Sequence, residues 1–129
     1  MKSLASFSDL GGRILLAAIF VASGLGKIAA YAGTQQYMAA HGAPGALLPL
    51  VIATEVGGGA MIVLGLFTRY AAVALAGFSV LTALMFHADF SDQMQQINFL
   101  KNLAIAGAFF TMAAHGAGRL SLDARRAAA

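Results

Sequence analysis

The chain has 129 residues, of which 60% are hydrophobic and only 10% are charged, and its formal net charge is +3. A soluble domain carries about 25% charged residues, and a soluble chain of this size could not hide so much apolar surface. The composition therefore predicts one membrane domain covering residues 1–129. The absence of cysteine excludes disulfides, thiol redox pairs and cysteine-ligated iron–sulfur centres. No basic patch is interleaved with aromatic residues, so we expect no nucleic-acid partner.

Four apolar blocks predict four transmembrane helices, near residues 11–30, 46–67, 69–87 and 98–115. A helix needs about 20 apolar residues to cross a bilayer, and about 17 is the lower limit. The late position of Arg13 and the presence of Lys27 favour a retained first helix over a cleaved signal peptide. Only a tight turn separates the second and third blocks, so their helices are expected to be antiparallel neighbours. The predicted fold is all-α, a polytopic bundle of four transmembrane helices.

The connections between these blocks differ in character. The first connection ends in a cluster of helix breakers at residues 42–45, and the stretch from Gln35 to His41 is expected to form a short interfacial helix. Residues 88–98 contain Asp89, Asp92 and three glutamines, which predicts a solvated loop.

The positive charges predict the orientation. One side of the four-helix topology carries Lys2, Arg13, Arg69, Arg119, Arg125 and Arg126. The other side carries Lys27 and Lys101, which are offset by Asp89 and Asp92. Because positive residues concentrate on the cytoplasmic side, we expect an inner-membrane protein with both termini in the cytoplasm.

Glu55 is the most informative residue of the second block, because it lies near the middle of a membrane-spanning segment. An unpaired ionised carboxylate there is very unfavourable, so Glu55 is either protonated or paired. Lys27 and Lys101 lie at a depth from which their long side chains can approach it. A structural ion pair and a proton-exchanging catalytic pair of Glu55 and Lys27 both fit this pattern. The expected ligand-binding cluster in the outer half consists of Lys27, Glu55, His87, Lys101 and Asn102.

Helix periodicity gives each of three helices a stripe with polar ends and a small or apolar middle. The stripe on the first helix is Arg13, Ala17, Phe20, Gly24 and Lys27. The third helix has Arg69, Val73, Ala76, Val80, Ala83 and His87, and the fourth has Lys101, Ala108, Met112 and His115. Snorkelling at the membrane faces would also account for Arg13, Arg69 and His115. Gly58 and Gly59 beside Glu55 favour close helix packing, or a cavity wall. The scattered histidines predict no metal site.

Four segments together resemble the DoxX family of small four-helix membrane proteins: GRILLAAIFVASGLGKI (12–28), TEVGGGAMIVLGLFTR (54–69), FLKN (99–102) and GAGRLSLDA (116–124). The family pattern places emphasis on Arg13, Gly24, Lys27, Glu55, Gly58, Arg69, Gly118, Arg119, Ser121 and Asp123. Of these, Arg13, Gly24, Gly58, Arg69, Arg119 and Asp123 are expected to be structural, together with Gly59. Some relatives are linked to thiosulfate oxidation by quinone, and others accompany responses to quinones or catechols.

The resemblance implies a redox membrane subunit that handles a quinone or another small molecule, and a label of oxidoreductase by resemblance alone. Lys27 or His87 would donate a hydrogen bond to a quinone oxygen, and Glu55 would exchange the proton. The alternatives are a non-enzymatic anchor or assembly partner of a redox complex, and a small permease. The partners expected are the lipid bilayer, a redox protein and a second copy of the chain.

Overall fold

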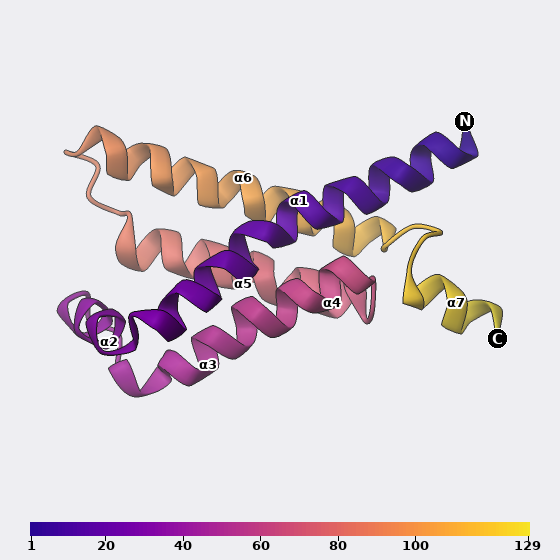
Figure 1. Cartoon of the computed structure of the whole chain (residues 1–129). Coiled ribbons are helices and arrows are strands. Elements are labelled where there is room, and N and C mark those ends of the chain that lie inside the picture. The colour runs from indigo at the N-terminus through magenta and orange to yellow at the C-terminus, as the bar shows by residue number, and fades with distance from the viewer.

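The computed structural model describes residues 1–129, and these residues form helices and connecting turns without strands. The elements are α1 (Lys2–Ala29), α2 (Tyr31–Ala40), η1 (Gly45–Leu47), α3 (Leu48–Ile52), η2 (Ala53–Gly57), α4 (Gly58–Leu64), α5 (Thr68–Phe86), α6 (Gln93–His115) and α7 (Leu122–Ala128). Four segments are long and apolar enough to cross a membrane, namely α1, the rod Gly45–Leu64, α5 and α6. The predicted all-α, four-span fold is therefore confirmed. Both termini lie at the same end of the bundle (Figure 1).

Two helix boundaries differ from the predicted ones by more than three residues. α1 begins at Lys2, well before residue 11. α6 begins at Gln93, so the predicted loop over residues 88–98 is much shorter. Asp92 caps this helix, because its Oδ1 accepts a hydrogen bond from the Met94 N–H at 2.9 Å. The glutamines that suggested a loop are good helix formers once such a cap is present.

The helices pack in a sequence around the bundle. α1 packs against η2 and α4, α4 packs against α5, and α5 packs along α6. α1 and α6 make few direct contacts, and the rings of Phe20 and Phe109, 5.5 Å apart, join them at mid-height. The seam between α1 and α6 is therefore the least closely packed junction, and it contains hollows on both sides of these rings.

Small residues allow the other helices to approach closely. A Cβ atom added to Gly24 would lie 2.5 Å from Cγ2 of Val56, and one added to Gly59 would lie 2.7 Å from Cγ2 of Val21. A Cβ atom added to Gly58 would lie 3.2 Å from the side chain of Leu75. In a membrane, such contacts supply the packing that holds helices together.

Arg13 is 1% exposed and joins three parts of the chain at the end of the bundle that carries the termini. Its guanidinium donates to the carbonyl oxygens of Ile62 at 3.1 Å and Val63 at 2.8 Å, and also to that of Leu120. The last carbonyls of a helix have no partner within the helix, so Arg13 caps α4. Snorkelling does not describe this residue, because its side chain turns into the protein.

Arg69 and Asp123 cap two further helices at the same end. Arg69 Nη1 donates to the carbonyls of Ala113 at 3.0 Å and Ala114 at 2.7 Å, which end α6. The carboxylate of Asp123 accepts from the N–H groups of Phe67 and Thr68, both at 2.8 Å. The C-terminal segment thereby closes over the turn between α4 and α5.

Candidate functional site

Lys27 and Glu55 form the ion pair of this chain. Lys27 Nζ lies 3.0 Å from both carboxylate oxygens of Glu55 and donates to Ser23 Oγ at 2.6 Å. The Glu55 side chain is 5% exposed and that of Lys27 is 26% exposed. Of the two lysines predicted to approach Glu55, Lys27 is thus the partner.

Glu55 is carried by an irregular turn of the second rod. Residues Ala53–Gly57 form the π-helical segment η2, in which the chain is wound more loosely than in an α-helix. Such π-bulges are rare and occur frequently at functional sites. A Cβ on Gly24 would lie 3.2 Å from that of Glu55, so the bare glycine of α1 allows η2 to come close enough for the pair to form.

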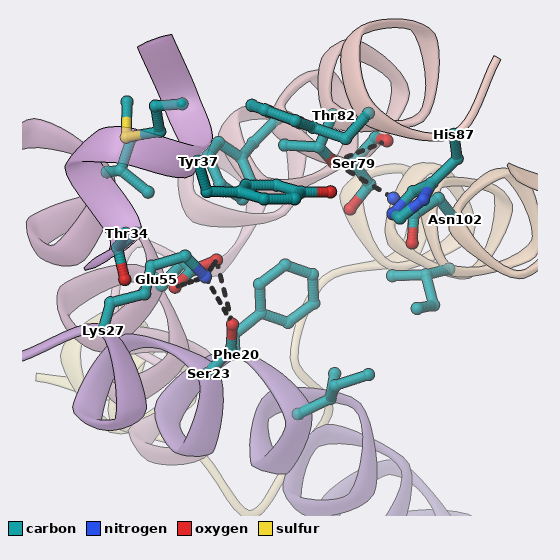
Figure 2. Close-up of a pocket in the computed structure, with 16 residues that line it drawn as sticks. Phe20, Ser23, Lys27, Thr34, Tyr37, Glu55, Ser79, Thr82, His87 and Asn102 are labelled. Carbon is teal, nitrogen blue, oxygen red and sulfur yellow. Dashed lines mark hydrogen bonds and ion pairs between the residues drawn. The ribbon is translucent and has the colours of Figure 1, made fainter. Parts of the chain in front are cut away.

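The ion pair faces a cavity of about 260 Å³ that is bounded by α1, α2, the second rod, α5 and α6. Two polar groups of residues lie on opposite sides of it, with the rings of Phe20 and Tyr37 between them (Figure 2). The first group is Ser23, Lys27 and Glu55. The second group is Ser79, Thr82, His87 and Asn102.

Hydrogen bonds orient the second group. Asn102 Nδ2 donates to Thr82 Oγ1 at 3.0 Å, and His87 Nδ1 lies 2.9 Å from Gln95 Oε1. Within the chain, the amide oxygen of Asn102 and Nε2 of His87 form no hydrogen bond. Each of these side chains thus keeps one polar atom available for a ligand.

α2 covers one side of the cavity. Its Tyr37 ring stacks on Phe86 with 5.5 Å between centroids, and the His41 ring lies 4.3 Å from Tyr37. The Tyr37 hydroxyl is directed toward the second polar group (Figure 2). The short helix predicted near residues 35–41 is therefore present as α2, and it supplies cavity residues that the sequence did not point to. Only the spacing of Ser23, one turn before Lys27, could have signalled another member of the site.

The structure brings together four of the five residues predicted for the binding cluster, namely Lys27, Glu55, His87 and Asn102. The fifth residue, Lys101, does not belong to the cluster as predicted, because it is exposed and does not line the cavity. α6 buries Ala106 and Phe109, whereas the predicted stripe ran through Lys101 and Ala108. One residue along a helix turns the side chain by about 100°, so Asn102 faces inward and Lys101 outward.

The stripe predicted on the third transmembrane helix, which is α5, is only partly buried. Ala76 and Ala83 are fully buried, but Val73 is 53% exposed. The face of α5 that packs inward is shifted toward Ala72, Leu75 and Ser79, because α5 must contact both α4 and α6.

Comparison with known proteins identifies relatives for nearly the whole chain. The chain is 48% identical over 123 residues to the inner membrane protein YqjF of Escherichia coli K12, covering 95% of each chain. It is 42% identical over 120 residues to the inner membrane protein YphA of the same organism, covering 88% of this chain and 86% of YphA. No solved structure matches it significantly. The sequence model of DoxX matches residues 8–88, from α1 through α5, and the chain therefore belongs to the DoxX family.

Proposed function

We propose that this chain is an inner-membrane redox subunit that binds a quinone, or a closely related aromatic ring with two oxygens, in the cavity beside Lys27 and Glu55. The observation that carries the proposal is the arrangement of two polar groups on opposite sides of an aromatic-lined cavity. The inner-membrane location is supported by the names of the two relatives and by the four apolar helices.

The residues fit such a ligand in shape and in chemistry. Ligand pockets are mostly apolar, with a few polar groups that fix orientation, and a cavity of about 260 Å³ suits a single ring. Phe20, Tyr37 and Phe78 offer ring surfaces, and aromatic pairs pack favourably. The Lys27 ammonium would donate to one ring oxygen. The opposite oxygen would be bound in the quinol form, in which its hydroxyl donates to the amide oxygen of Asn102 or to Nε2 of His87.

Lys27 and Glu55 would also take part in proton transfer to the bound quinone. A bound quinone supplies electron-accepting chemistry, and its conversion to the quinol takes up two electrons and two protons. In this proposal a redox partner protein supplies the electrons. Lys27, the more exposed member of the pair, holds the quinone oxygen by its hydrogen bond, and Glu55 exchanges the proton, as general acid–base catalysis requires.

The orientation is part of the same proposal. With both termini in the cytoplasm, the cavity lies in the outer half of the membrane. The chain contains no cysteine, so single cysteines at Ser3 and Asp92 can be labelled without background. Labelling of Ser3→Cys and Asp92→Cys from opposite sides of intact membranes is expected, with Ser3→Cys reached only from the cytoplasm.

A direct binding measurement tests the cavity. A short-chain benzoquinone is titrated against the detergent-purified protein, and its dissociation constant is compared with those of Lys27→Met, Glu55→Gln and Lys101→Met. The first two changes are expected to weaken binding at least tenfold. Lys101→Met removes an equivalent charge outside the cavity, so it is the matched control and should bind as the parent does.

A non-enzymatic anchor of a redox complex is the second candidate, because the Lys27 and Glu55 side chains already satisfy one another. This role predicts that a redox protein is co-purified while the benzoquinone binds the parent and all three variants equally weakly. That result would replace the quinone proposal with the anchor.

A further inference from the structure

A second hollow lies at the other end of the α1–α6 seam, away from the quinone cavity. It encloses about 660 Å³ and is lined by Ser8 to Leu16 of α1 and by Ala108 to Ala117 of α6 and the turn after it. Small side chains keep it open. A Cβ on Gly12 would meet no atom within 4 Å.

Polarity changes along this groove in one direction. Leu15, Leu16, Ala108 and Met112 line the part nearest the middle of the bundle, and His115 and Ser8 line the part nearest its end. A third hollow of about 480 Å³ adjoins the groove at Asp9 and is lined by Lys2, Ser6, Gly118 and Arg119. The path along α1 from Leu16 to Lys2 covers about 21 Å at 1.5 Å per residue. The groove is therefore apolar at one end and cationic at the other, which suits an amphiphile with an anionic head.

Arg13 supplies a buried donor part-way along the groove. It is 1% exposed, it lines the groove, and its Nε has no hydrogen-bond partner in the chain. Its two terminal nitrogens are occupied by carbonyl groups of α4 and Leu120. A buried donor without a partner is rare in folded proteins, and an oxygen of a bound molecule would satisfy it.

The cationic end of the groove carries a net positive charge. Lys2 and Arg119 are exposed, and Lys27 and Glu55 form the sole ion pair of the chain. Asp9 is the one acidic residue of the two hollows, and it lies within electrostatic range of Arg13. Asp123 also lies within electrostatic range of Arg13, so three cationic side chains against two carboxylates leave one positive charge to attract an anion.

We propose that this groove binds an anionic glycerophospholipid. One acyl chain lies against Leu15, Leu16 and Met112, an ester or phosphate oxygen accepts from Nε of Arg13, and the headgroup lies toward Lys2 and Arg119. A second copy of the chain fits less well, because an apolar helix in the groove would leave the Arg13 donor unpaired. Clusters of basic residues beside a transmembrane helix attract anionic lipids electrostatically.

Lipid retention measures this site independently of the quinone cavity. The protein is extracted from nanodiscs that contain equal amounts of phosphatidylglycerol and phosphatidylcholine, and the retained lipid is counted by native mass spectrometry. The parent is expected to retain phosphatidylglycerol about tenfold over phosphatidylcholine. In the Lys2→Gln/Arg119→Gln variant this preference should fall to about twofold. The charge-matched control Lys101→Gln/Arg125→Gln alters exposed cations outside both hollows and should keep the parent's preference.

A second variant separates the acyl chain from the headgroup. Gly12→Leu places a side chain into the open groove, so it should reduce retention of both lipids while leaving the cationic end intact. Equal retention of the two lipids by the parent would overturn the proposal, and so would stabilisation by inorganic phosphate as strong as that by phosphatidylglycerol. Disulfide-linked dimers formed by Gly12→Cys in membranes would also overturn it, because they would show that a second copy fills the groove.

Discussion

The charged side chains at the two ends of the bundle bind different kinds of partner. At the end that carries the termini, Arg13, Arg69 and Asp123 bind main-chain atoms of other helices. At the end that carries the cavity, Lys27 and Glu55 bind each other. A charge that satisfies main-chain atoms is part of the fold, and moving it exposes helix ends. A charge that satisfies another side chain can change partner or protonation while every helix stays intact, which is what a binding site requires.

The largest effect is expected from Arg13→Met. This change leaves three carbonyls without their donor in a buried place, and hydrogen bonds to charged groups contribute about 1.5–3 kcal/mol each. We expect the free energy of unfolding in detergent to fall by about 3 kcal/mol or more. Arg69→Met provides the comparison, because Arg69 is exposed and bonds to two carbonyls. If the free energy of unfolding fell less for Arg13→Met than for Arg69→Met, the assignment of Arg13 as the cap that joins α1, α4 and the C-terminal segment would be contradicted.

The glycine contact beside the cavity should be the next most sensitive. Gly24→Leu drives a side chain into Val56 and Glu55, and overpacking typically costs about 1–3 kcal/mol. We expect lower thermal stability and loss of the ion pair. Gly26→Leu is the control, since a Cβ there meets no atom within 4 Å. Equal melting temperatures for the two variants would mean that α1 and η2 separate without penalty.

The ion pair should matter less for stability than for binding. Removing one partner of a buried pair costs about 3–5 kcal/mol, but Lys27 is partly exposed, so we expect about 1–2 kcal/mol for Glu55→Gln. The double change Glu55→Leu/Lys27→Met should be nearly neutral for stability, because no unpaired charge remains. The same double variant should not bind the benzoquinone. A double variant that binds as well as the parent would assign the pair to the fold, like the charges at the opposite end.

The smallest effect concerns Asp123 and acid. Partial burial would by itself raise the pKa of Asp123, but hydrogen bonds from Thr68 and Phe67 and the nearby Arg126 outweigh it, so the pKa lies below its usual value. A carboxylate with a depressed pKa stabilises the fold above its unfolded pKa of about 3.9 and loses this contribution as the pH falls through the folded value.

The predicted loss resembles that of a helix N-cap, about 0.5–1 kcal/mol. Melting curves between pH 3 and pH 7 should show this acid-dependent decrease in the parent, and a smaller one in Asp123→Asn. An identical pH profile in both proteins would show that Asp123 titrates without contributing to the cap.

The sequence predicted the four helices and a contact of Glu55 with either Lys27 or Lys101, because apolar length and depth in a membrane are properties of the chain alone. It misplaced Lys101 because both faces of α6 are apolar or small, so the periodicity that marks a buried face is weak. The neighbouring Asn102 is the residue that faces inward.

Other features depend on contacts between distant residues. The partners of Arg13 lie 49, 50 and 107 residues away, and no local pattern distinguishes such a cap from a snorkelling side chain. The π-helical turn at Glu55 and the position of Tyr37 across the cavity arise from packing between helices, which leaves no signature in the sequence around them.

The bond between Arg13 and the carbonyl of Leu120 has a consequence for the timing of biosynthesis. A ribosome adds about 5–20 residues per second, so several seconds pass between the synthesis of α1 and that of its last partner. During this interval the guanidinium lies at the membrane without its full set of acceptors. We therefore expect α1 to settle into its final position only after translation ends, and nascent chains that stop before residue 120 to be recognised by membrane quality-control proteases.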